Sequence, residues 1–391
     1  MTSTFQNQTN KNSGETDLLG LTLPQLQAWL VERGEPAFRA KQIYSWLYAQ
    51  MVTEFAAMSN LPKTLRERLE AEACIGPLVV RSELHSKDDR TRKILLELAD
   101  GKLIESVLML YPPLGESSER ATVCVSSQAG CAFGCTFCAT GQMGFDRHLS
   151  AGEIVAQVLY FARELRAAPW AAVGLPGSKT IDHITNIVLM GMGEPLHNYD
   201  NVLQALRILN SSEGFHLGAR HMTVSTVGLV PAIRKLSQEQ LQVNLAISLH
   251  APTDELRSTT MPVNRKYPLR ELLSACRDYI DATRRQVTFE YVLLAGINDT
   301  PEYAHLLGEL LAPLHQFAHV NCIPVNATSA EYRPPQGDAI RAFRAILQEH
   351  GVSNSVRAER GDDIAAACGQ LRTRFEGRHK ALPVQPVSSP L

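Results

Sequence analysis

The 391-residue sequence lacks any apolar run long enough to span a lipid bilayer, so no membrane-spanning helix is expected. Its first residues, MTSTFQNQTNKNSGETD, contain no apolar segment of the kind found in a secretory signal. They include Glu15 and Asp17 but no arginine, which argues against a transit peptide. A cytoplasmic location is therefore expected. Thiols stay reduced there, so clustered cysteines are more typical of metal binding or catalysis than of structural disulfides.

The sequence also lacks an excess of either charge, an internal repeat and a long low-complexity tract. Lys and Arg total 38 against 40 Asp and Glu, which gives a formal charge of −2 and argues against a general basic coat for nucleic acid. A local basic patch is still compatible with this balance. With 45% hydrophobic residues, the chain is expected to form one large barrel with an appendage, or two or three average domains.

The N-terminal part predicts a small helical unit. Residues 1–17 are expected to form a disordered polar tail, and residues 18–100 an accessory domain. Apolar residues recur at helical spacing over 21–34, 36–50 and 61–73, while KILLELADGKLIESVLML, residues 93–110, predicts two strands around a glycine turn. The helices carry Arg39, Lys41, Lys63, Arg66 and Arg68. These basic residues form either a solvated face or a surface that docks RNA.

A regular alternation of strands and helices then predicts an α/β core over residues 101–350. Six short apolar segments are expected as parallel strands, at 121–127, 183–193, 220–228, 242–251, 286–296 and 319–327. Amphipathic helices separate them, and Ser150 with Glu153 predicts a capping box at the first of these helices. Polar or glycine-containing motifs follow the strands, which favours a full or partial barrel over a doubly wound sheet. Residues 351–376 follow as a C-terminal segment, and 377–391 as a disordered tail.

Four of the eight cysteines lie within fifteen positions, and three of these form the motif CxxxCxxC. Cys131, Cys135 and Cys138 stand in a loop rich in small residues, which lets the backbone wrap closely around a ligand. A structural zinc site would need a fourth ligand, such as a second CxxC or a nearby histidine. The nearest histidine, His148, comes ten residues after Cys138. Three thiols without a fourth indicate a metal cluster with one open coordination position.

This motif, with Phe137 before its last cysteine, resembles the signature of radical S-adenosylmethionine (SAM) enzymes. The longer motifs CVSSQAGCAFGCTFCATG, MGMGEP, VSTVG, SLHAP and RGDDIAAACGQL resemble the adenine-C2 RNA methyltransferases, over about residues 18–375. The resemblance implies an α/β fold, namely a partial (β/α)6-type radical SAM barrel with a small helical N-terminal accessory domain and a C-terminal extension. It also implies a [4Fe–4S] cluster held by the three cysteines, and two SAM molecules per turnover.

The resemblance also implies the residues of the cofactor site. Gly193 and Glu194 of MGMGEP are expected to hold the methionine amino group, as a carboxylate suits an ammonium. The remainder of the cofactor site is expected to comprise Ser225, Ser248, Leu249, His250 and Asn326. Taken singly, His250 is equally typical of a core or cap residue and Asn326 of a turn.

Two further cysteines are implied to be a catalytic pair. By resemblance, Cys368 is methylated and carries the methyl group to the adenine, and Cys124 then attacks the Cys368 sulfur and releases the product through a transient disulfide. Glu105 matches the family's proton acceptor, although an exposed strand glutamate is an alternative. Cys74, Cys276 and Cys322 have no partner motif and are expected to be structural.

The implied partners are 23S rRNA and, as in dual-specificity members, tRNA, with an electron donor such as a flavodoxin system; no membrane is involved and the protein is expected to be a monomer. Residues 111–120 and 166–180 look like insertions, and His148 and Ala327 replace the Asn and Pro common in the family.

Two alternatives to the adenine-C2 methyltransferase stay open. One is the related adenine-C8 methyltransferase, which shares the cysteine pair. The other is a non-catalytic RNA-binding protein with a structural zinc.

Overall fold

A computed structural model shows how the chain folds. It describes residues 15–76, 78–113, 119–170, 180–314, 316–326, 332–357 and 360–371. The predicted C-terminal tail, 377–391, and residues 1–14 of the predicted N-terminal tail lie outside these ranges. Within them, no helix is both long and apolar enough to cross a membrane.

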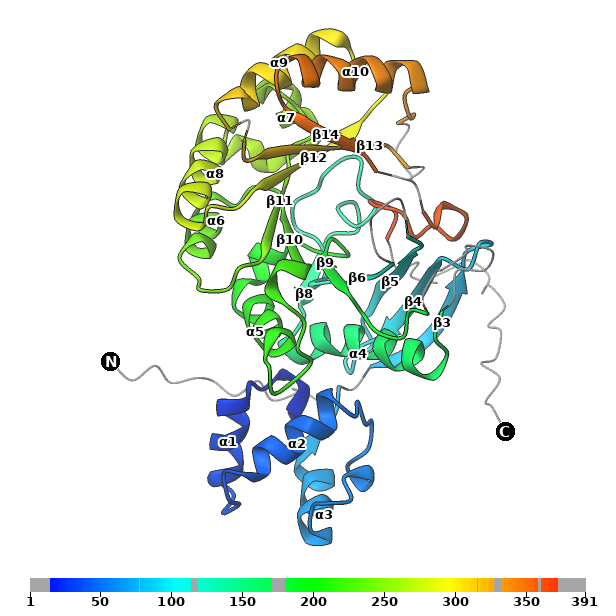
Figure 1. The fold of residues 1–391 in the computed structure, drawn as a ribbon, viewed down its shortest axis with the longest axis vertical. Coiled ribbons are helices and arrows are strands. Elements are labelled where there is room, and N and C mark those ends of the chain that lie inside the picture. The colour runs from blue at the N-terminus through cyan, green and yellow to red at the C-terminus, as the bar shows by residue number, and fades with distance from the viewer. Residues whose placement is uncertain are drawn as a thin grey trace.

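One curved sheet dominates the described structure, and ten strands take part in it (Figure 1). Seven of them run parallel: β6 (Arg120–Cys124), β9 (Asn186–Leu189), β10 (Met222–Thr226), β11 (Asn244–Ser248), β12 (Val287–Leu293), β13 (Ala318–Pro324) and β14 (Ser353–Val356). They pair in chain order, and β14 ends the sheet, so the barrel is open. The predicted parallel α/β sheet and partial barrel are therefore confirmed, with β14 as an additional parallel strand.

Helices connect each parallel strand to the next along the chain. They are α4 (Ala151–Ala167), α5 (Tyr199–Asn210), α6 (Val230–Ser237), α7 (Asp254–Thr260), α8 (Leu269–Thr283), α9 (Pro301–Leu311) and α10 (Gly337–Glu349). The predicted capping box of α4 is present, because the Glu153 amide donates to Ser150 Oγ at 3.1 Å and the Ser150 amide donates to Glu153 Oε2 at 2.9 Å. Each connection brings the carboxyl ends of the strands to the same edge of the sheet.

Three antiparallel strands extend the sheet beyond β6. They are β5 (Leu103–Tyr111), β4 (Thr91–Glu97) and β3 (Val79–His85). The predicted hairpin is confirmed as β4 and β5, with Gly101 in the turn at a φ of +80°. Since β5 pairs with β6, with Val107 opposite Cys124, the hairpin and the barrel form one sheet. The predicted boundary at residue 100 thus falls within this hairpin.

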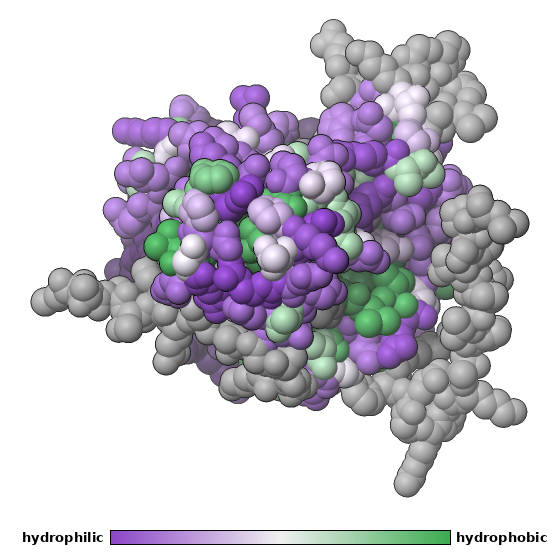
Figure 2. Space-filling view, turned by 90° about the horizontal axis from the view of Figure 1, so that it is seen from below, coloured by the Kyte–Doolittle hydropathy of each residue, from purple (hydrophilic) through white to green (hydrophobic). Residues whose placement is uncertain are grey.

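The helical unit at the N-terminal end consists of α1 (Leu23–Val31), α2 (Arg39–Tyr48) and α3 (Lys63–Glu72), and it lies beneath the barrel in Figure 1. The face of the molecule on that side is mainly hydrophilic, with scattered apolar residues (Figure 2). Thr16–Asp17 forms β1 and pairs with β2 (Ala73–Cys74). The predicted disordered tail is therefore wrong at Thr16 and Asp17, because backbone pairing and side-chain contacts fix them.

The Asp17 carboxylate joins the helical unit to the barrel. Its Oδ1 accepts hydrogen bonds from the amides of Leu19 and Gly76, both at 3.0 Å. Its Oδ2 is buried without a hydrogen-bond partner among the described residues, and it lies so close to Gly152 of α4 that a Cβ there would approach it to 1.9 Å. Burial raises the pKa of Asp17 to about 6, because a charged carboxylate is poorly solvated there.

Replacing Asp17 by Asn should change how stability depends on pH. A carboxyl group whose pKa is raised on folding contributes stability at low pH and loses it as the pH rises through about 6. We therefore expect the stability of D17N relative to the parent to increase by about 1.4 kcal/mol between pH 5 and pH 8. Urea unfolding at both pH values measures this. D281N, on the exposed surface of α8, serves as the control. If the free energies of unfolding of D17N and the parent differ by the same amount at both pH values, the pKa of Asp17 is not raised by folding.

Candidate active site

The three clustered cysteines lie in the loop between β7 (Gln128–Gly130) and β8 (Phe145–His148). The loop closes where the Cys131 amide donates to the Gly144 carbonyl at 2.7 Å. It is also tightly wrapped. A Cβ at Gly141 would lie 2.9 Å from the Cys135 nitrogen and 3.0 Å from its carbonyl oxygen. Only glycine fits at this position, as the abundance of small residues in the sequence indicated.

Hydrogen bonds join this loop to two segments that are distant in sequence. The Thr136 amide donates to the Thr260 carbonyl at 3.0 Å, at the end of α7. The Ala139 amide donates to the Gly369 carbonyl at 2.8 Å. The second bond brings Cys368, the residue before Gly369, to the cysteine loop.

A cavity of about 150 Å³ opens at the carboxyl ends of the parallel strands. It is lined by residues from the loop and from the strand ends, including Cys131, Cys135, Cys138, Gly193, Glu194, Ser225, Ser248, His250, Asn326, Arg357 and Cys368. The structure thus brings together the three clustered cysteines, Cys368 and all but one of the residues predicted for the cofactor site. The exception is Leu249, whose side chain is fully buried in the core.

Glu194 is the buried carboxylate of the cavity. Its Oε1 accepts from the Leu196 amide at 3.0 Å, and its Oε2 accepts from the Val227 amide at 2.8 Å. Burial raises its pKa to about 7, although these hydrogen bonds act in the opposite direction. A cationic group in the cavity would favour the charged form of Glu194.

His250 occupies a constrained position at the end of β11. Its φ is +58°, which is uncommon for a residue other than glycine, and its Nδ1 accepts from the Val292 amide at 3.0 Å. Its ring packs edge-on against Phe137 of the cysteine loop, with 4.8 Å between centroids. Burial lowers its pKa to about 3, so the ring is neutral at pH 7.

Cys124 and Cys368 line a second, smaller pocket that adjoins the first, and Met190, Asn326, Arg357 and Cys368 are among the residues that line both. Asn326 donates through Nδ2 to the Cys368 carbonyl at 3.0 Å, and its Oδ1 is buried without a hydrogen-bond partner among the described residues. Cys124 comes from the end of β6, and Cys368 comes from the C-terminal segment. The cysteine that stands apart in the sequence thus faces the pocket shared with Cys368.

The environment of these two thiols contains opposing influences. Burial raises the pKa of Cys124 to about 12 and also raises the pKa of Cys368. The positive charge of Arg357 lowers both. Burial likewise raises the pKa of Cys131 to about 12 and that of Cys135 further, so all of these thiols need a nearby positive charge or metal to ionise at neutral pH.

Glu105 lies on β5 and is buried, so the alternative of an exposed strand glutamate is wrong. Its Oε1 forms an ion pair with Lys93 Nζ at 3.0 Å, and Lys93 also donates to the Ala365 carbonyl. Glu105 lines neither pocket. However, alternate residues of a strand share a face, and Met109 and Tyr111 of the same strand do line the second pocket. Glu105 therefore projects on the face that points toward Cys124.

The basic residues of the helical unit are largely engaged within the fold. Lys41 pairs with Glu213, Lys63 with Glu67, and Arg68 with Glu35. Arg39 donates to Gln42 Oε1 and Arg66 to the Ala56 carbonyl. Three of the five charges that sequence reasoning considered as an RNA-docking surface are therefore matched by carboxylates.

Sequence reasoning missed several residues of the site. Arg357 and Lys93 lie in strand-like segments, and nothing in their local pattern indicates a partner. Arg257 is fully buried, and it donates to the carbonyl groups of Leu249, Val227 and Ser248. It thereby fixes the ends of β10 and β11. Its place in the mainly polar α7 sequence, DELRSTT, predicts only an exposed helix residue.

The thiol loop borders space for a bound group. Cys131, Cys135 and Cys138 line one cavity, yet among the described residues no three His, Cys, Asp or Glu side chains are gathered closely enough to hold one metal ion. The small residues of the loop and the adjoining cavity leave room beside the thiols.

Comparison with known proteins identifies two family models in the chain. The Ribosomal RNA large subunit methyltransferase N-terminal domain matches residues 16–75, and the Radical SAM superfamily matches residues 178–307. The first covers the helical unit, and the second begins beyond the cysteine loop.

Curated relatives match nearly the whole chain. A probable dual-specificity RNA methyltransferase RlmN from Roseiflexus castenholzii is 46% identical, covering 91% of this chain and 95% of the relative. One from Geobacillus thermodenitrificans is 47% identical, covering 93% and 96%. The crystal structure of a radical SAM methyltransferase from Sphaerobacter thermophilus is 48% identical, with a TM-score of 0.84, covering 91% of this chain and 99% of that chain.

Replacing Gly141 by Ala should disturb the thiol loop. The added Cβ would overlap the Cys135 backbone, and overpacking of this kind costs about 1–3 kcal/mol. We expect G141A to bind less iron than the parent after anaerobic reconstitution, measured by iron content and visible absorbance. G337A is the matched control, because a Cβ there would meet only the end of the Arg341 side chain, at 3.4 Å. Equal iron content in G141A and the parent would show that the tight wrapping is not required.

Proposed function

The chain belongs to the RlmN family of radical SAM RNA methyltransferases, and from this premise we propose that it methylates C2 of an adenosine in 23S rRNA and in tRNA. The relatives named above are dual-specificity enzymes by description, which supports the two substrates. One observation carries the proposed mechanism. Cys124 and Cys368 line a pocket that adjoins the cavity of the three clustered cysteines, and Cys368 lines both.

The residues present suit the cofactors that the family uses. In this proposal Cys131, Cys135 and Cys138 hold one [4Fe–4S] cluster, and Glu194 accepts the methionine ammonium of SAM. The rest of the cofactor site is formed by Gly193, Ser225, Ser248, His250 and Asn326, while Leu249 supports it from the core. When bound, the cluster and SAM supply the methyl group and the radical chemistry, with two SAM molecules used per turnover. An electron donor such as a flavodoxin reduces the cluster, and the protein acts as a monomer.

Cys368 and Cys124 act in sequence in this proposal. Cys368 carries the methyl-derived carbon on its sulfur and bonds through it to the adenine, because an aryl carbon is too weak a nucleophile for direct methyl transfer. The Cys124 thiolate then attacks the Cys368 sulfur, so that an S–S bond forms and the bond between this sulfur and the carbon on the adenine breaks. The electron pair of the broken bond stays with that carbon, which takes up a proton and becomes the methyl group of the released base. Arg357, which lines both pockets, favours the thiolate that this attack requires.

Glu105 is the proposed acceptor for the proton that leaves the ring carbon. Its ion pair with Lys93 keeps a carboxylate available on the pocket-facing side of β5. Glu105 lies on the strand next to that of Cys124, and the pairing of Val107 with Cys124 places both side chains on one face of the sheet. The adenine must leave its stack to enter the pocket.

The product identifies the reaction directly. The cluster is reconstituted anaerobically, and SAM, a reductant and separate rRNA or tRNA samples lacking the modification are added. We expect 2-methyladenosine in the nucleoside digest of both RNAs by mass spectrometry. Finding 8-methyladenosine would support the related C8 activity, and finding methylation of only one RNA would remove the second substrate. No methylated adenosine from an iron-loaded enzyme would contradict the proposed function.

Replacing Cys124 by Ala should trap the RNA on the protein. Without the attacking thiolate, the bond between Cys368 and the methylated base cannot be resolved. We expect a covalent protein–RNA adduct on denaturing gels with C124A, and none with C368A or the double variant. C74A is the control, because Cys74 lies on β2 in the helical unit. Release of methylated RNA by C124A at the parent's rate would show that Cys124 does not resolve the adduct.

A further inference from the structure

A buried glutamine connects the turn that carries Glu194 to two histidines outside the cavity. Gln128, on β7, is fully buried. Its Oε1 accepts from the Glu194 amide at 2.8 Å. Its Nε2 lies 3.0 Å from His148 Nδ1 and 3.1 Å from His197 Nδ1. The side-chain amide of Gln128 is therefore held at both ends.

The backbone amide of Glu194 decides the orientation of this glutamine. An amide N–H can only donate, so the Gln128 oxygen must face Glu194 and its NH₂ group must face the histidines. Each of the two N–H bonds then points to an Nδ1 that accepts, which requires the ring proton on Nε2 in both His148 and His197. Both rings are consequently neutral when the unit is intact. Burial lowers the pKa of His148, in agreement with a neutral ring.

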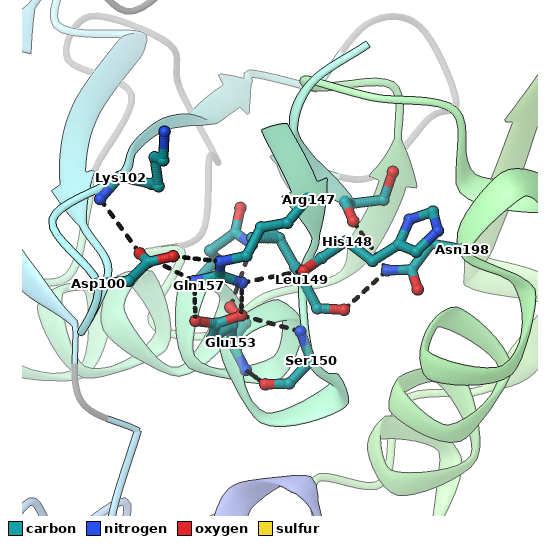
Figure 3. A network of polar contacts seen from close by, with 10 residues as sticks. Asp100, Lys102, Arg147, His148, Leu149, Ser150, Glu153, Gln157 and Asn198 are labelled. Atoms are coloured by element: carbon teal, nitrogen blue, oxygen red, sulfur yellow. Dashed lines mark hydrogen bonds and ion pairs between the residues drawn. The ribbon is translucent and has the colours of Figure 1, made fainter. Parts of the chain in front are cut away.

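The elements that carry the two histidines are fixed by a polar network (Figure 3). Arg147, next to His148, donates to both carboxylate oxygens of Glu153 at 2.8 Å and to the His148 carbonyl at 2.9 Å. Asn198, next to His197, donates to the carbonyls of Ser127 and Leu149. The two rings meet edge to face, with 4.8 Å between their centroids.

The same glutamine restricts the cofactor turn. Gly193 has a φ of +103°, and a Cβ there would approach Gln128 Cβ to 2.6 Å. The backbone amide of Gln128 also donates to the Met192 carbonyl at 3.1 Å. Met192, Gly193 and Glu194 thus pack directly on Gln128, and a movement of its side chain would displace the Glu194 backbone.

We propose that Gln128, clamped by the neutral pair His148 and His197, is a positioning residue that orients Glu194 for the ammonium group of the cofactor. This inference rests on the proposed function, in which the cavity binds SAM. The histidines act through Gln128 and do not touch the cavity. Gln128 needs one hydrogen-bond acceptor at position 148 and one at position 197, each placed where the histidine Nδ1 now lies. Asparagine does so with its Oδ1, and it does not titrate.

The test measures SAM binding to the anaerobically reconstituted full-length protein by equilibrium dialysis, together with the nitrogen shifts of the imidazoles by NMR. We expect both rings of the parent to have an unprotonated Nδ1 and a protonated Nε2. H148L/H197L removes both acceptors and leaves a buried NH₂ group unsatisfied, so SAM affinity should fall by about tenfold or more. H148N/H197N should restore it to within about threefold of the parent.

A second histidine pair supplies the matched control. His305 and His350 also meet ring to ring, with Nδ1 and Nε2 3.0 Å apart, but they lie on and beside α9 and α10, away from the cavity. H305N/H350N should leave SAM affinity unchanged. The iron content must be equal in all variants, so that a change in SAM affinity reports only on the turn that carries Glu194.

Two results would overturn the proposal. One is a protonated Nδ1 on either ring at neutral pH. The other is parent-like affinity in H148L/H197L when the parent binds SAM. If the iron-loaded parent itself does not bind SAM, the proposed function fails and the positioning role with it, whereas the other two outcomes leave the proposed function standing.

Discussion

The backbone hydrogen bond between Ala139 and Gly369 is the contact on which the site depends. It joins the loop of three clustered cysteines to the segment that carries Cys368, across some 230 positions of sequence. The Thr140 hydroxyl of the same loop donates to the Leu371 carbonyl and reinforces this connection. The clustered cysteines and Cys368 consequently line one cavity. The antiparallel strands contribute as well, because Lys93 of β4 donates to Ala365 in the same segment. The hairpin thus helps to hold the C-terminal side of the active site.

Burial governs the electrostatics of this cavity. It favours the neutral form of Glu194, whose pKa is about 7, of His250, at about 3, and of Cys124, at about 12. A charged ligand can shift such a group to its ionised form, and the two opposite charges then attract each other within the cavity. An ammonium group would return Glu194 to its carboxylate form. Arg357 plays the corresponding part for the thiols, because it lowers the pKa that burial raises.

Local signals in the sequence predicted much of the fold because their physical causes are local. Ser150 and Glu153 form their capping box within one turn of α4, and the glycine between β4 and β5 takes the positive φ that a tight turn needs. Apolar strands alternating with amphipathic helices leave a parallel sheet as the main solution. By contrast, β1 was assigned to a tail. Its order comes from pairing with β2 and from the buried Asp17, and both of these contacts are distant in sequence.

The sequence by itself determined the parallel α/β core, the cysteine motif and the polar residues at the strand ends, since spacing and periodicity express these directly. Only the tertiary structure decided which of them meet. It placed Leu249 in the core rather than in the cavity, paired Glu105 with Lys93, and put Arg357 in the pocket that Cys124 and Cys368 line. It also engaged much of the N-terminal basic charge in ion pairs. A charge or a thiol has no local signature of its partner, because its partner is selected by chain folding and not by the neighbouring sequence.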